Sequence, residues 1–258
     1  YSMFGFQRVG DAAWQAGDMR ARGFMLGGTA GRTTLNGEGL QHEDGQSQTQ
    51  AGLIPNVRSY DPTFAYEVVT IVQHGMQRML AEQRDEYWYL TLMNENYTHP
   101  EMPEGSAEGI IKGMYLLKDA GKAKKGELRV QLMGSGTILR EVIAAADLLD
   151  ADFGIKADIW SCPSFNELSR DGVDAERWNR LHPEAKAPRK PWVTQQLEGR
   201  SGPAIAATDY VRHFANQVRE YVPMRYSVLG TDGYGRSDTR ANLRRHFEVD
   251  RFHVAHAA

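Results

Sequence analysis

The stretch GRTTLNGEGLQHEDGQSQ, residues 31–48, interrupts a chain that otherwise alternates short apolar runs with longer amphipathic segments. It is rich in glycine and in charged, hydroxyl and amide side chains, and it holds few apolar residues. We expect such a run not to pack as a core element, and to form a long functional loop. Ordered loops of this length in a compact domain usually carry binding or catalytic residues.

The segments around this loop define the fold class. Short apolar runs at residues 24–28 and 57–60 predict strands on either side of it, and the aromatic-rich run at 87–93 is typical of a buried strand. Residues 63–80 carry apolar side chains at helical spacing, and Asp61 before Pro62 is expected to be the N-cap of that helix. Prolines and glycines at 94–108 predict a linker.

A second alternating set follows the linker. Asp209 is expected to cap one of its helices, Ser237 or Asp238 another, and Arg170-Asp171-Gly172 to interrupt a third. The predicted strands are 128–133, 157–160, 204–208 and 226–230, and the predicted helices are 138–149, 166–181, 210–218 and 239–247. Strands that alternate with helices predict an α/β fold of two domains, each a mainly parallel sheet flanked by helices.

The composition excludes several classes of partner. The formal net charge is −3 and no basic face stands out, so we expect no nucleic acid. No apolar stretch approaches the roughly 20 residues that cross a bilayer, so we expect no membrane partner. The single cysteine, Cys162, excludes an intrachain disulfide and suits a reducing cytoplasm, which is the expected location.

Two groups of residues suggest a site with chemistry. Tyr1 and Phe4 lie three residues apart, on one face if the segment is helical, where an aromatic side chain can stack on a flat heteroaromatic ring or pack in a core. His42 can exchange a proton near neutral pH, or it can be a solvated loop histidine. The residues alone leave both alternatives open.

Six motifs, SMFGFQR, GRTTLNGEGLQHEDG, YDPTFAYEV, NENY, ELSRDG and LGTDGYGRSDTR, together resemble the homodimeric type of pyruvate dehydrogenase. This family is the thiamine-diphosphate-dependent first component of the pyruvate dehydrogenase complex, and the resemblance runs over essentially the whole chain in consistent order. It implies a transketolase-like fold. It also implies a fragment, with residues 1–102 forming the second part of the pyrimidine-binding middle domain and 103–258 a transketolase-like C-terminal domain, incomplete at its end.

The resemblance further implies an oxidoreductase that decarboxylates pyruvate oxidatively. Its homodimer would use thiamine diphosphate and Mg²⁺ and pass the acetyl unit to the lipoyl group of dihydrolipoyl acetyltransferase. The Gly-Asp-Gly motif that holds the metal in thiamine enzymes does not occur in these 258 residues. The metal ligands and the activating glutamate are therefore expected in the missing N-terminal part. No metal ligand is assigned here, and the fragment alone is expected to be inactive.

The match also carries roles to particular residues. Phe4 matches the position that stacks on the cofactor's aminopyrimidine ring, and Tyr1 and Arg8 match polar neighbours of that ring. His42 matches a catalytic histidine that faces the substrate. Glu43 and Asp44 belong to the same substrate loop.

One departure from the family pattern leaves alternatives open. Gln46 and Gln48 stand where the pattern has two histidines, and glutamine can hydrogen-bond but cannot shuttle a proton at neutral pH. One alternative is a transketolase-type ketol transferase, although this loop lacks the basic residues that sugar phosphates need. The other is a non-catalytic dimerisation or assembly fragment, which the absent metal motif and the two glutamines favour.

Overall fold

Two mainly parallel sheets organise the chain, of which the computed structural model describes residues 2–258, with the backbone alone at residues 3 and 4. The strands of the first sheet, in spatial order, are β1 (Phe24–Gly27), β3 (Tyr87–Thr91) and β2 (Val57–Tyr60). The strands of the second, in spatial order, are β4 (Tyr115–Lys118), β6 (Lys156–Ser161), β5 (Arg129–Gly134), β7 (Ala204–Ala207) and β8 (Tyr226–Leu229). The edge strand β4 runs antiparallel to β6, and the other pairings are parallel.

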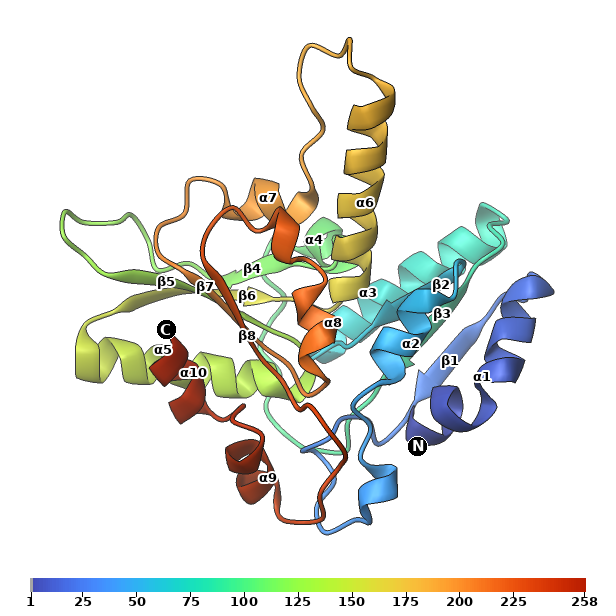
Figure 1. The fold of residues 1–258 in the computed structure, drawn as a ribbon, viewed down its shortest axis with the longest axis horizontal. Coiled ribbons are helices and arrows are strands. Elements are labelled where there is room, and N and C mark those ends of the chain that lie inside the picture. The colour runs from blue at the N-terminus through green and yellow to red at the C-terminus, as the bar shows by residue number, and fades with distance from the viewer. Residues whose placement is uncertain (1) are drawn as a thin grey trace.

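Helices flank both sheets (Figure 1). They are, in chain order, α1 (Ser2–Asp18), α2 (Ser47–Leu53), α3 (Ala65–Met76), α4 (Ala107–Lys112), α5 (Leu139–Phe153), α6 (Phe165–Leu181), α7 (Trp192–Leu197), α8 (Arg212–Asn216), α9 (Arg240–His246) and α10 (Arg251–Ala257). In β5, Leu132 packs toward α5 and α10, whereas its neighbour Met133 packs toward α6, α7 and α8. Both faces of β5 are therefore covered by helices, as is usual for a strand inside a mainly parallel sheet. The structure confirms the predicted α/β class.

The predicted strands all form, with ends within two residues of the expected ones. The edge strand β4 and the short helices α2, α4, α7 and α10 are not predicted from the sequence. The expected interruption of α6 is wrong: the helix is continuous, and the ring of Tyr221 packs closely against Gly172, where a side chain would collide with it. Packing of this face outweighs the weak helix propensity of glycine.

The expected helix caps are also wrong in three places. Helix α3 begins at Ala65, and its first turn is held by Glu67 Oε2, which accepts from the backbone N–H of Phe64 at 3.0 Å. Helix α9 is capped by Thr239, one residue beyond the expected pair. Asp61 and Asp209 cap no helix, because both carboxylates are buried and bind hydroxyl groups of distant segments.

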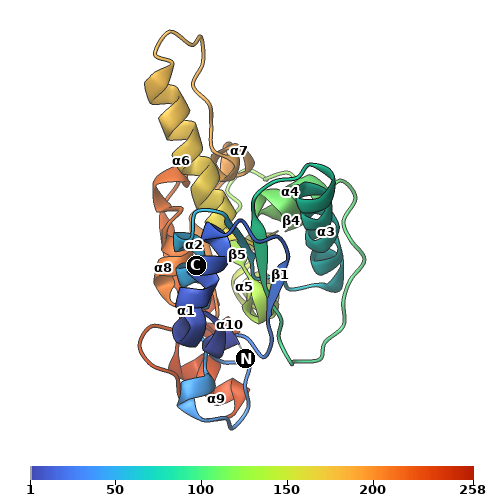
Figure 2. The same ribbon diagram turned by 90° about the vertical axis from the view of Figure 1, so that its right-hand side faces the viewer.

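Helix α6 projects from the body of the molecule, and residues 182–191 return from its tip to α7 (Figures 1 and 2). Among the residues that the structure describes, no helix is long and apolar enough to cross a membrane.

Candidate functional site

The carboxyl ends of strands from both sheets meet in a buried polar region. Asp61, directly after β2, accepts hydrogen bonds from Thr91 Oγ1 at 2.7 Å and from Ser135 Oγ at 2.8 Å. Thr91 is the last residue of β3 and Ser135 directly follows β5, so Asp61 joins the first sheet to the second. Burial raises the pKa of Asp61 to about 7, and its hydrogen bonds oppose that shift. Ligand sites of open α/β sheets lie at this end of the strands.

Asp209, two residues after the end of β7, holds the glycine-rich stretch in this region. Its carboxylate accepts from the N–H of Thr33 at 3.0 Å, from Thr33 Oγ1 at 2.7 Å and from Thr34 Oγ1 at 2.9 Å. Burial raises the pKa of Asp209 to about 6. The expectation that residues 31–48 do not pack inside is therefore wrong for much of the stretch. Its buried members are residues 31–35, 43–45, 47 and 48.

His42 lies at the partly exposed part of this stretch, in a single 3₁₀ turn, Leu40–His42. Its Nδ1 is 3.0 Å from Glu38 Oε2, and its side chain is 24% exposed. Next to the turn, Gln7 of α1 donates to Asp44 Oδ1 at 3.3 Å. The structure thus brings α1, which carries the predicted cofactor-binding positions, against the turn that carries His42.

Glu43 and Asp44 are both fully buried. Asp44 Oδ1 accepts from the backbone N–H groups of Gln46 at 3.1 Å and Ser47 at 2.9 Å, which fixes the start of α2. Neither carboxyl oxygen of Glu43 has a hydrogen-bond partner among the described residues. Burial, with the charge of Asp209 adding to it and that of Arg32 opposing it, raises the pKa of Glu43 to about 8. At neutral pH Glu43 is therefore mostly the neutral acid.

We expect Glu43→Gln to flatten the pH dependence of stability. Between the unfolded pKa near 4.5 and the folded value near 8, the folded chain keeps a proton that the unfolded chain has lost. Stability therefore falls as pH rises through this window, and an amide, which carries no charge, escapes the loss. Relative to wild type, the variant should gain on the order of 2–4 kcal/mol between pH 5 and pH 9.

Thermal melting of the full-length protein across this pH range measures the effect. Glu38→Gln is the matched control, because it removes a carboxylate that is 40% exposed from the same stretch of chain. Its melting curve should remain parallel to that of wild type. Parallel curves for Glu43→Gln as well would show that Glu43 ionises normally in the folded state.

Gln46 and Gln48 both make hydrogen bonds that hold the loop. Gln46 Oε1 accepts from Arg32 Nη2 at 2.9 Å. Gln48 is buried, and its Nε2 donates to the carbonyl of Tyr60 at 2.8 Å and to Thr91 Oγ1 at 3.1 Å. The amide of Gln48 therefore connects the loop to the ends of β2 and β3, whereas that of Gln46 connects two parts of the loop itself.

The remaining predicted site residues lie in or before α1. Arg8 is exposed on this helix. Phe4 lies in the same helix, but the structure does not describe its side chain, and Tyr1 lies outside the described residues. Their assignment to a cofactor therefore remains a prediction. Among the described residues, no group of three or more His, Cys, Asp or Glu side chains could hold a metal ion.

Four charged residues of this region were missed by the sequence analysis: Arg32, Asp61, Asp209 and Arg244. The two aspartates directly follow predicted strands, which is a signal for a site at the sheet edge, but the same position also suits a helix cap. Arg244 pairs with Glu95 and contacts Thr137 Oγ1 at 3.3 Å. Nothing in the local sequence distinguishes these buried arginines from exposed ones.

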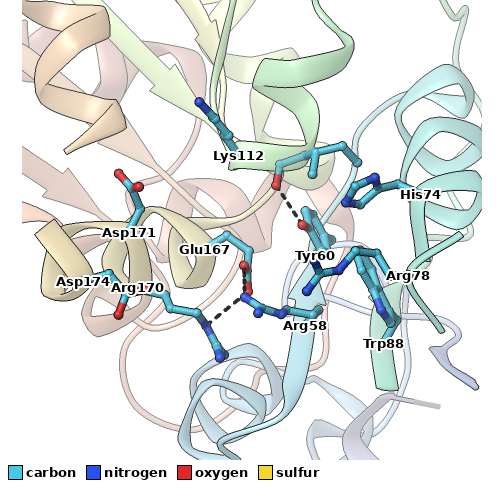
Figure 3. A pocket seen from close by; sticks show the side chains of 11 residues that line it. Arg58, Tyr60, His74, Arg78, Trp88, Lys112, Glu167, Arg170, Asp171 and Asp174 are labelled. Atoms are coloured by element: carbon cyan, nitrogen blue, oxygen red, sulfur yellow. Dashed lines mark hydrogen bonds and ion pairs between the residues drawn. The ribbon is translucent and has the colours of Figure 1, made fainter. Parts of the chain in front are cut away.

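Apart from this polar region, a hollow of about 240 Å³ lies between β2, α3 and α6, with Tyr60 and Trp88 stacked in it (Figure 3). Its arginines are paired with acids: Arg58 Nη1 is 2.7 Å from Glu167 Oε2, and Arg78 Nη2 is 2.8 Å from Glu86 Oε2. Because these charges compensate one another, the hollow offers no excess charge to a ligand. It is better explained as an ion-pair connection between β2 and α6.

Comparison with known proteins defines the class first. The structure superposes on transketolase from Campylobacter jejuni with a TM-score of 0.70 at 17% identity, covering 100% of this chain and 34% of that one. Transketolase from Leishmania mexicana gives a TM-score of 0.69 at 17% identity, covering 100% of this chain and 32% of that one. Residues 113–250 match the family model for the transketolase-like C-terminal domain. The chain has the transketolase-like fold.

Sequence comparison then shows which proteins the chain resembles along its length. Residues 1–100 match the model for the middle domain of the pyruvate dehydrogenase E1 component. The chain is 62% identical over 258 residues to the pyruvate dehydrogenase E1 component of Cupriavidus necator, and 57% identical over 260 residues to that of Escherichia coli K12. Each alignment covers 100% of this chain and 29% of the relative's length. The chain belongs to the family of transketolase-like C-terminal domains through residues 113–250 and is similar along its whole length to pyruvate dehydrogenase E1 components. It spans less than a third of the relatives it matches.

Proposed function

We propose that the protein containing this chain is the first component of a pyruvate dehydrogenase complex. It would decarboxylate pyruvate oxidatively with thiamine diphosphate and Mg²⁺, and transfer the acetyl unit to a lipoyl group of the acetyltransferase. The observation that carries the proposal is the 62% identity, along the whole chain, to a relative with this name. Homodimerisation is part of the same proposal.

Two described residues fit the aminopyrimidine part of the cofactor. Gln7 Oε1 and Asp44 Oδ2 are buried acceptors without hydrogen-bond partners where α1 meets the His42 turn. Acceptors of this kind suit the amino group of an aminopyrimidine ring, beside which Tyr1, Phe4 and Arg8 are proposed to lie. The Mg²⁺ ligands and the diphosphate site are proposed to lie outside these 258 residues, which hold no Gly-Asp-Gly motif. When bound, the cofactor supplies an electron sink for decarboxylation.

His42 is proposed to move protons next to the substrate. The Glu38 carboxylate at Nδ1 fixes the ring orientation and the proton of the neutral imidazole on that nitrogen, so Nε2 is the basic nitrogen. Glu43 and Asp44 are proposed to hold this turn and not to touch the substrate, since both are buried.

Steady-state assays of the full-length protein test the proposed function. With thiamine diphosphate and Mg²⁺, we expect turnover of pyruvate with an artificial electron acceptor, and release of CO₂ with acetylation of an added lipoyl domain. A ketose phosphate with an aldose phosphate acceptor should give no comparable rate. Turnover of the sugar phosphates instead would favour the transketolase alternative, and no turnover of either would favour a non-catalytic assembly role.

A further inference from the structure

Arg32 lies at the centre of the buried polar region, and the residue is only 1% exposed. Its Nη1 donates to the carbonyl oxygens of Thr231, at 2.5 Å, and of Gly233, and its Nη2 donates to Gln46 Oε1 at 2.9 Å. The guanidinium therefore ties the stretch after β1 to the residues that follow His42 and to the loop between β8 and α9. This loop is 199 residues further along the chain.

The surroundings of Arg32 affect the stability of its positive charge in two opposite ways. Burial lowers its pKa, while the negative charges of Asp44 and Asp209 oppose that change. A buried cation is costly unless acceptors and opposite charges surround it. Nη1 and Nη2 of Arg32 find their acceptors in the observed arrangement of the three segments, so the side chain favours that arrangement, although its Nε is buried without a partner among the described residues.

The loop between β8 and α9, to which Arg32 binds, packs against the residues on either side of His42. The backbone at Gly235 packs against the carbonyl oxygen of Leu40 and Cβ of Glu43, so closely that a Cβ at Gly235 would overlap both. Leu40 and Glu43 bracket His42 in the chain. In both orientations the light-blue segment that contains His42 lies beside the orange-red loop before α9 (Figures 1 and 2).

A backbone hydrogen bond also connects the segment that contains His42 to the loop before α9. The backbone N–H of Gly37 donates to the carbonyl of Asp238 at 3.0 Å, just before the His42 turn on one side and just before α9 on the other. Gly37, Leu40 and Glu43 therefore all contact the loop from Thr231 to Asp238. The orientation of His42 depends on the position of that loop.

We propose that Arg32 is a positioning residue for His42, which fixes the loop at Thr231 and Gly233 and thereby the direction in which the His42 turn faces the substrate. The inference rests on the proposed function, since His42 has its chemical role there. A lysine at this position keeps the charge but lacks the planar fork that reaches several acceptors at fixed angles. The arrangement thus requires arginine and not merely a cation.

The test uses the full-length protein carrying Arg32→Lys, with Arg58→Lys as the matched control. Arg58 is a partly buried arginine that binds two carboxylates far from His42, in the hollow of Figure 3. Two quantities are measured for each: amide hydrogen exchange of residues 37–46, and kcat and KM for pyruvate. The kinetic measurement is repeated for Arg32→Lys combined with His42→Ala.

Arg32→Lys should speed exchange in residues 37–46 and lower kcat by about tenfold or more, while KM changes by less than about twofold. In the His42→Ala background it should cause no further loss of kcat, because its effect passes through His42. Arg58→Lys should leave both the exchange of this segment and kcat unchanged.

Wild-type exchange in Arg32→Lys, or losses of kcat that simply multiply in the double variant, would remove the positioning role. If Arg32→Lys does not fold, Gly235→Ala displaces the same turn from the other side and must give the same faster exchange and lower kcat. If the wild-type protein does not turn over pyruvate, the proposed function fails by itself. The exchange measurement then still decides whether Arg32 orders the turn.

Discussion

Replacing His42 by alanine is expected to lower turnover of pyruvate by the full-length protein about 10²-fold or more, the usual range for losing a proton-transfer group. The side chain is partly exposed, and its Nδ1 lies 3.0 Å from Oε2 of Glu38, whose side chain is 40% exposed. Stability should therefore change by less than roughly 1 kcal/mol. Comparison of kcat with the melting temperature separates a chemical effect from a structural one.

His213→Ala is the matched control for this experiment, because it removes an exposed histidine from α8, away from the turn. It should keep wild-type turnover. Near-normal turnover in His42→Ala, or a loss that follows a fall in melting temperature, would exclude His42 from the chemistry.

Asp209→Ala is expected to have the largest effect on stability, about 3–5 kcal/mol, seen as a fall in melting temperature. The alanine would leave the buried donors of Thr33 and Thr34 without an acceptor. Arg244 would lose a neighbouring negative charge as well. Thermal melting of the full-length variant at pH 8, where the carboxyl is ionised, measures the loss.

Asp232→Ala provides the comparison for a surface carboxylate. The side chain of Asp232 is 44% exposed, and its partner Arg212 is more exposed still. Exposed ion pairs contribute little, so the cost should stay below about 1 kcal/mol. Equal losses in the two variants would mean that burial at Asp209 adds nothing to its hydrogen bonds.

The strands and long helices of both sheets could be predicted from the sequence, because apolar spacing is a local property. Residues 57–60 and 166–181 show this, since burial of their apolar side chains decides their conformation. Short helices such as α7 and α10, with 6 and 7 residues, carry too few positions for a periodicity to be recognised. Tertiary packing, not propensity, determines them.

The candidate site was predicted only in part, for a related reason. His42 and its neighbours stand out in the sequence because the stretch is polar and glycine-rich. The partners that bury this stretch, Asp209 and the carbonyls of Thr231 and Gly233, lie 175 or more residues away. A polar run is expected at the surface unless such partners are known, and hydrogen bonds between distant segments leave no local pattern.

The separation of Arg32 from Thr231 by 199 residues also bears on biosynthesis. A chain that emerges from the ribosome with its N-terminus first presents residues 31–46 long before the loop that completes their bonds. The first sheet can form early, since its strands end at Thr91. We therefore expect a stalled nascent chain that ends before residue 231 to hold β1, β2 and β3 together while His42 is still without a fixed orientation. Proton-transfer competence would then be among the last properties that the growing polypeptide acquires.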